Sequence, residues 1–123
     1  MEGSRSSGLV PDCPVGPDRL TMLKAFEEKA GIRFRNHEFL NLSFFHRSLG
    51  GEANPGTGNN ERLEFLGDSV LGLVISDYLF CSLPDRAEGE LAKIKSYVVS
   101  EDTLSEVSLE LGVDKLLVMG KGE

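Results

Sequence analysis

The sequence is dominated by the stretch Asn60-Glu61-Arg62-Leu63-Glu64-Phe65-Leu66-Gly67-Asp68-Ser69-Val70-Leu71. In a helix, Glu61, Glu64 and Asp68 fall within an arc of about 60° over two turns. Apolar residues occupy the other side, and the run from Leu63 to Phe80 is apolar around most of its circumference. That pattern is typical of a helix buried inside a domain. We therefore expect one long central helix that carries an acidic stripe.

The acidic stripe has two interpretations. Carboxylates that share one face of a buried helix repel one another and lose hydration, and a bound cation relieves both costs. Hard oxygen ligands favour Mg²⁺ or Mn²⁺ as that cation. Alternatively, the acids face solvent and gain only about 0.3–1 kcal/mol each from the helix dipole. Phe65 beside the stripe favours a functional surface, as do Gly67 and Gly72, since each mid-helix Gly costs about 1 kcal/mol relative to Ala.

Length and composition indicate one small domain. A chain of 123 residues has room for one core, and contents of 40% hydrophobic and 27% charged residues are ordinary for a soluble protein. No segment approaches 18 consecutive apolar residues, so we expect no membrane-spanning helix and no membrane partner. The N-terminus lacks a basic-then-apolar signal pattern. Cys13 and Cys81 alone do not suggest a disulfide framework or a zinc site, so a cytoplasmic location is expected.

The net charge of −7 is unevenly distributed. Residues 1–60 carry seven acids and seven bases, whereas residues 61–123 carry thirteen acids and six bases. A generic nucleic-acid-binding protein shows a basic stripe, and none is visible in this sequence. A polyanionic substrate would therefore be held through metal ions or with charge supplied elsewhere.

The hydrophobic pattern predicts an all-α fold. Residues 1–17 are rich in proline, glycine and serine and are predicted to form a disordered tail. No alternating strand pattern is found in the rest of the chain, residues 18–123. Five helices are predicted: 19–30 after a cap at Asp18, 37–47 after Asn36, a third from Glu61 after Asn59 or Asn60 and ending before Pro84, 86–99, and a fifth between Ser100 and Gly112. Leu20, Leu23, Phe26 and Ala30 are the predicted buried face of the first helix.

Other polar residues carry weaker signals. Glu88 and Glu90 begin the fourth helix. They are interpreted either as acids that interact favourably with the dipole of that helix or as the source of a fourth carboxylate that folds back towards the acidic stripe. The two histidines, His37 and His46, do not lie near a nucleophile in a strand-turn-helix elbow, so a hydrolase triad is not supported. The pair Glu27–Glu28 is interpreted as a solvated face.

The stretch 60–71 resembles the signature of the ribonuclease III family, and the match is uninterrupted. His46-Arg47-Ser48 precedes the variable loop, as it does in the family. Glu88-Gly89, with Leu91 and Lys93, resembles the next family segment, and residues 120–123 resemble the loop that follows. The resemblance covers about residues 19–123.

The resemblance implies an Mg²⁺-dependent endonuclease that cleaves double-stranded RNA and acts as an all-helical homodimer in RNA processing, such as rRNA and mRNA maturation. Glu64 matches a metal-ligating glutamate of the family, and Asp68 matches its essential catalytic aspartate. Glu61 and Glu88 match outer acids that line the catalytic valley. Phe65 matches a residue that contacts the partner subunit.

One departure from the family pattern limits these expectations. The family builds its centre from four carboxylates, two of which come from a later helix, and the sequence stops at Glu123 before a segment of that kind. The double-stranded-RNA-binding domain of bacterial members is not in the sequence either. We therefore expect little or no cleavage by the chain alone. The alternative is a non-catalytic dimerisation or RNA-scaffold fragment that keeps the signature helix.

Overall fold

The computed structural model describes residues 15–46 and 59–119, and these residues are helical for most of their length. The elements are α1 Pro17–Ala30, α2 His37–Ser43, α3 Glu61–Ser82, α4 Glu88–Val98, α5 Glu101–Leu111 and the 3₁₀ turn η2 Val113–Lys115. Within the described ranges there is no β-strand, only an isolated parallel bridge between Phe45 and Val118. The prediction of an all-α fold is confirmed.

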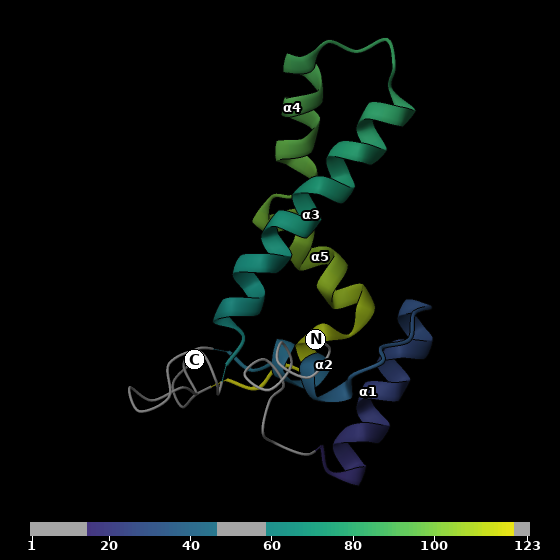
Figure 1. Ribbon diagram of the computed structural model, residues 1–123, viewed down its shortest axis with the longest axis vertical. Helices are drawn as coiled ribbons and strands as arrows, with labels where there is room; N and C mark the ends of the chain where they lie inside the picture. The colour runs from purple at the N-terminus through teal and green to yellow at the C-terminus, as the bar shows by residue number, and fades with distance from the viewer. Residues whose placement is uncertain (1–14, 47–58, 120–123) are drawn as a thin grey trace, which may run out of the picture.

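The helices form a base and an arm (Figure 1). In the base, α1 packs against α2 and against α5. Helix α3 leaves the base and extends along the arm, and α4 returns beside it in the opposite direction. Helix α5 then leads from the end of α4 back to the base. The helix that carries the acidic stripe is therefore attached to the base at its N-terminal end.

Local sequence signals account for most helix ends. The side chain of Asn36 accepts a hydrogen bond from the backbone N–H of Phe39 at 2.9 Å, and Ser100 accepts one from Thr103 at 3.3 Å. Gly31 and Gly112 end α1 and α5 with φ of 74°, a left-handed conformation that glycine adopts without steric cost. These four ends lie where the sequence predicts them.

Other predicted boundaries are wrong by a few residues. Helix α1 starts at Pro17 after Gly16 rather than after Asp18, because proline has no N–H to leave unpaired and its φ suits the first helical position. Helix α2 ends at Ser43 rather than near Arg47, and α4 starts at Glu88 rather than Arg86. Of the predicted tail, residues 1–14 lie outside the described residues.

The core lies in the base. Its buried apolar residues come from three distant parts of the chain: Leu23, Leu40, Phe44 and Leu116. The Phe26 ring meets Phe44 edge to face, with centroids 5.4 Å apart. Leu23 is the centre of this cluster, since none of its surface is exposed. Phe44 belongs to this cluster although the sequence pattern did not mark it as a core residue.

Arg19 ties the same core together from its edge. Its Nε donates to the Asn41 side chain at 2.7 Å, and its Nη2 donates to the Leu116 carbonyl at 2.6 Å. The guanidinium also lies 6.0 Å from the centroid of the Phe44 ring. Burial lowers the pKa of Arg19, and the two hydrogen bonds offset the lost hydration. One side chain therefore links α1, α2 and the end of the described chain.

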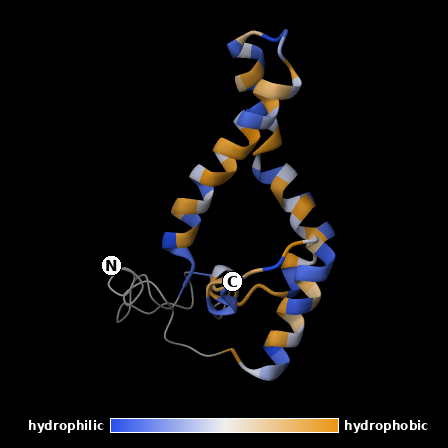
Figure 2. Ribbon diagram, turned by 45° about the vertical axis from the view of Figure 1, so that its right-hand side comes forward, coloured by the Kyte–Doolittle hydropathy of each residue, from blue (hydrophilic) through white to orange (hydrophobic). Residues whose placement is uncertain are grey.

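The sequence prediction that α3 is a buried helix is wrong for the described residues. Only Leu79 is buried on it, and large apolar side chains remain exposed along the arm. Figure 2 shows in orange how apolar residues recur along this helix. The exposed side chains on α3 are Phe65, Leu66, Val70, Leu73, Val74, Tyr78 and Phe80. The helix is apolar around most of its circumference, but in the described part of the chain α4 is the element that packs most extensively along it, and one helix covers one stripe.

Helix α3 is also long and apolar enough to cross a membrane by length and composition. The sequence argument that excluded any spanning helix is therefore wrong on these two criteria. They are weak evidence for a membrane, because core helices of soluble domains meet them as well.

Replacement of Leu23 by alanine tests the position of the core. We expect Leu23→Ala to lower the free energy of unfolding by about 2–5 kcal/mol, because it leaves a cavity in a fully buried site. Urea denaturation followed by circular dichroism measures the change. Met22→Ala is the control on the same helix, at a side chain that is 42% exposed, and should change stability by no more than about 0.5 kcal/mol. Equal losses in both variants would contradict this core.

Candidate active site on the acidic helix

The N-terminal end of α3 is fixed to the base through two asparagines. The Asn60 side chain donates to the Ser43 carbonyl at 2.7 Å, and its backbone N–H donates to the Phe45 carbonyl at 2.7 Å. The buried Asn59 side chain accepts from the backbone N–H of Glu61 at 2.9 Å. Asn60 holds the N-cap position, but Asn59 supplies the side-chain cap. These contacts fix where the acidic stripe begins.

The three carboxylates of the stripe are exposed to solvent. Glu61, Glu64 and Asp68 all lie on the exposed part of α3. Among the described residues, no group of three His, Cys, Asp or Glu side chains is close enough to hold a metal ion. Because exposed carboxylates keep their hydration, the argument that burial of the stripe demands a cation does not hold. The assignment of Glu64 and Asp68 as metal ligands, with Glu61 as an outer acid, therefore stays a prediction.

A smaller metal site remains compatible with the stripe. Mg²⁺ in proteins is often held by one or two carboxylates, while water and substrate phosphates complete its coordination. Glu64 and Asp68 are one helical turn apart, so their carboxylates lie on the same side of α3. This pair of hard oxygen donors fits the ion, although Glu61 does not join them in a three-acid group.

Glu88 lies at the far end of the arm and not beside the stripe. It is the first residue of α4, and α4 runs antiparallel to α3. Lys95 of α4 lies against Gly72, so Glu88 is level with the region of Leu79. At 1.5 Å per residue, that position is about 16 Å along the helix axis from Asp68. Glu88 therefore does not fold back towards the stripe within the described chain, and its role as an outer acid stays a prediction.

A cleft of about 530 Å³ runs between α3 and α4 and includes Asp68. Its walls are formed by Asp68, Ser69, Leu71, Gly72, Leu73, Ser76, Lys95 and Val99. Lys95 and the two serines were not recognised from the sequence as site residues. Helical periodicity places Lys95 on the side of α4 that faces α3. This periodicity identifies Lys95 as a site residue only when the pairing of α3 with α4 is known.

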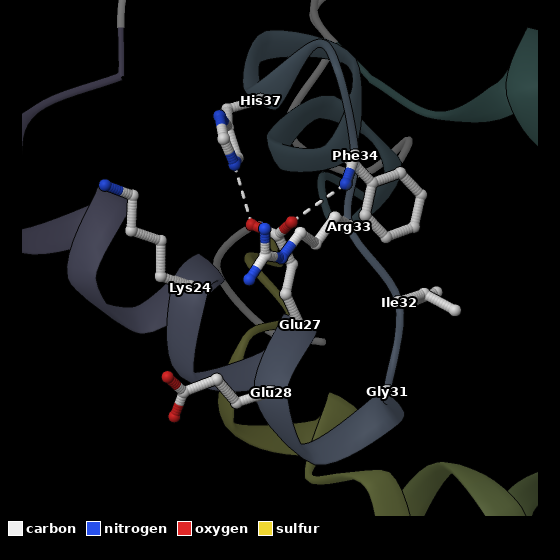
Figure 3. Close-up of a pocket in the computed structure, with 8 residues that line it drawn as sticks. All are labelled: Lys24, Glu27, Glu28, Gly31, Ile32, Arg33, Phe34 and His37. Carbon is white, nitrogen blue, oxygen red and sulfur yellow. Dashed lines mark hydrogen bonds and ion pairs between the residues drawn. The ribbon is translucent and has the colours of Figure 1, made fainter.

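A second cleft, of about 550 Å³, lies in the base around Glu27 (Figure 3). Glu27 was interpreted as part of a solvated face, and that interpretation is wrong, since only 7% of its surface is exposed. One carboxylate oxygen accepts the Phe34 backbone N–H at 2.8 Å, and the other lies 2.6 Å from His37 Nε2. Glu28, its neighbour, points to solvent as predicted. The contact between Glu27 and His37 joins α1 to the start of α2.

The hydrogen bonds to Glu27 stabilise its charged form. The Phe34 N–H lowers the pKa of Glu27 most, and the hydrogen bond from His37 lowers it further, while burial opposes both. His37 is thereby identified as part of a structural pair with Glu27 rather than a catalytic base. The other histidine, His46, follows α2 and donates its backbone N–H to the Val118 carbonyl at 2.9 Å.

Known proteins match this chain in sequence and in structure. The model of the ribonuclease-III-like family matches residues 36–123. Ribonuclease 3 of Treponema denticola is 52% identical over 107 residues, which are 87% of this chain and 44% of that protein. Ribonuclease 3 of Borreliella burgdorferi is 44% identical over 106 residues, 86% of this chain and 43% of that protein. This chain belongs to the ribonuclease III family.

The ribonuclease III assignment also holds at the level of the fold. The solved nuclease domain of ribonuclease III from Campylobacter jejuni matches with a TM-score of 0.72 and 32% identity, over 82% of this chain and 67% of that one. A second crystal structure of that domain matches with a TM-score of 0.71. The chain spans less than half the length of the two ribonuclease 3 proteins that it matches. It corresponds to part of a ribonuclease III nuclease domain, and α3 is the helix with the family signature.

Glu27 should make stability depend on pH. Because its pKa is lowered in the folded chain, its contribution is fully present above the ordinary pKa of 4.5 and is lost as the pH falls through the lowered folded value. We expect Glu27→Gln to lower the urea midpoint clearly at pH 7, and the difference from the unmodified chain to shrink below pH 4. Glu28→Gln, at the exposed neighbour, is the control and should change the midpoint little at either pH. A difference that is constant from pH 7 to 3 would contradict the role of the charge.

Proposed function

We propose that this chain supplies the signature helix of an endoribonuclease III that hydrolyses phosphodiesters in double-stranded RNA. Its biological role would be RNA processing in the cytoplasm, including maturation of rRNA and mRNA. The observation that carries the proposal is the uninterrupted signature at residues 60–71, which lies in a ribonuclease III fold with Glu64 and Asp68 exposed on one side of α3. Exposure matters because a rigid duplex can reach only side chains that project from the surface.

Glu64 and Asp68 are the residues that would hold Mg²⁺, or Mn²⁺ in its place. When bound, the ion would lower the pKa of the attacking water and neutralise charge on the phosphate oxygens. The contribution of the chain is to keep the two carboxylates one turn apart on a helix whose N-terminal end is fixed by Asn59 and Asn60. Double-stranded RNA is recognised mainly by its shape and backbone, so base specificity would be weak. Glu61 and Glu88 would act as outer acids of the same valley.

Asp68 is the residue on which cleavage should depend. Under single-turnover conditions, with excess chain, a duplex RNA and Mg²⁺, we expect little cleavage, because the described residues bring no three metal-ligating side chains together. Asp68→Asn should lower that rate at least about 100-fold, since it removes a charged metal ligand. Asp77→Asn is the matched control on the same helix, also exposed, and should cleave like the unmodified chain. Cleavage that survives Asp68→Asn would refute the assigned centre.

A second function is favoured by the same structure. The described residues gather no three-acid metal group, and the arm exposes a large apolar surface. A non-catalytic dimerisation or RNA-scaffold fragment would need the surface but not the metal. Absence of cleavage, combined with duplex-RNA binding that Asp68→Asn does not change, would support this second function over the first.

We also propose a homodimer that forms through the exposed side of α3. The Phe65 side chain is 80% exposed, and Leu66, Val70 and Leu73 of the same helix are exposed as well. Large exposed apolar surfaces mark interaction sites on soluble proteins. The matching nuclease domain from Campylobacter jejuni has a flexible region involved in dimer formation. Phe65 is the large aromatic residue closest to the acidic stripe, which would place the interface next to the site.

Sedimentation can test the contact at Phe65. We expect the unmodified chain to be dimeric at tens of micromolar, and Phe65→Ala to raise the dissociation constant at least about tenfold, as truncation of a central aromatic residue commonly does. Phe80→Ala provides the comparison, because Phe80 is 73% exposed at the opposite end of α3. A monomeric unmodified chain, or equal weakening by both changes, would contradict the proposed contact.

A further inference from the structure

Lys95 reaches from α4 into the cleft that contains Asp68. Its Nζ lies 3.6 Å from the position that a Cβ atom would occupy on Gly72. Because Gly72 has no side chain, the ammonium group can approach the backbone of α3 closely. A Cβ atom at position 72 would lie in ordinary van der Waals contact with this lysine, so only a side chain larger than that of alanine would displace the ammonium group.

The ammonium group of Lys95 is close to the acidic stripe but is not neutralised by it. Gly72 follows Asp68 by one helical turn, and Cβ atoms at this spacing are about 5–6 Å apart, so Lys95 Nζ lies within about 10 Å of the Asp68 Cβ. The Cα–Cβ bonds of a helix tilt towards its N-terminus, which is the direction of Asp68. Within the described ranges, the ion pairs are Glu27–His37 and Glu90–Arg86, and neither involves Lys95.

Charge makes this lysine distinctive in its surroundings. Helix α3 carries four acids and one base, Arg62, and α5 carries four acids and no base. Among the described residues that line the cleft, Lys95 is the only cation. A phosphodiester that approaches Asp68 would otherwise meet mainly negative charge, and one unpaired ammonium group on the cleft wall provides the compensating contact.

We propose that Lys95 binds a backbone phosphate of the RNA duplex beside Asp68, with the Ser69 and Ser76 hydroxyls on the same wall of the cleft. This inference rests on the proposed function, because it takes duplex RNA as the ligand of the site. Lys95 contributes binding and register: it fixes which phosphate lies at the carboxylates. It carries no sequence information, since an ammonium group contacts any phosphate alike.

The test compares two lysines of the same helix. Lys95 is half-buried in the cleft, whereas Lys93 is exposed and does not line it, and each Lys→Ala change removes one charge. Affinity for a blunt duplex RNA is measured by fluorescence anisotropy with Mg²⁺ at several salt concentrations. We expect Lys95→Ala to weaken binding about 3- to 10-fold and to reduce the slope of log affinity against log salt by about one. Lys93→Ala should weaken binding less than twofold, and Lys95→Arg should restore most of the affinity.

Each outcome of this experiment separates the two proposals. Equal effects of Lys95→Ala and Lys93→Ala, or an unchanged salt slope, would overturn the role of Lys95 and leave the proposed function intact. A packing role for Lys95 would instead be indicated if Lys95→Ala lowered the thermal midpoint of unfolding enough to explain the lost affinity and Lys95→Arg did not retain the affinity. That result would also overturn the proposed phosphate contact. If the unmodified chain does not bind duplex RNA, the proposed function itself fails and this assignment fails with it.

Discussion

The attachment of α3 to the base depends on three consecutive residues, Phe44, Phe45 and His46. The backbone groups of Phe44 and His46 pair with Val118 at 2.9 Å each, and the Phe45 carbonyl accepts the N–H of Asn60 at 2.7 Å. The short segment after α2 is therefore held on one side by the end of the described chain and on the other by the start of α3. Since Phe44 is also part of the core, the acidic helix is positioned by the same contacts that bury the hydrophobic cluster.

This construction explains why the site lies on an exposed arm. The base buries its own apolar side chains, whereas in the described part of the arm α3 and α4 pack mainly against each other. Two helices can cover only a part of a helix that is apolar around most of its circumference. Glu64 and Asp68 consequently remain hydrated, and no cation is needed merely to neutralise them. A metal ion would be held by them only together with its own water or with the phosphates of a substrate.

The electrostatic organisation follows from the same geometry. Under the proposed function, positive charge is needed where the phosphates of RNA approach, and in the described lining of the cleft beside Asp68 that charge is Lys95 of α4. The buried carboxylate of Glu27 has a structural role. It is hydrogen-bonded to the Phe34 backbone N–H and to His37, and it connects α1 to α2. One carboxylate organises the base, while those of the stripe remain available for a ligand.

Patterns that involve neighbouring residues were sufficient for the helices, for the caps at Asn36 and Ser100, for the glycine-ended helices and for the family of the protein. These features depend on interactions within a few residues of the chain or, for the family, on one long uninterrupted motif. The exposure of α3, the distance of Glu88 from the stripe, the burial of Glu27 and the position of Lys95 against Gly72 could not be read in this way. Each depends on how elements pack against one another, because burial and proximity arise from contacts that helical periodicity does not specify.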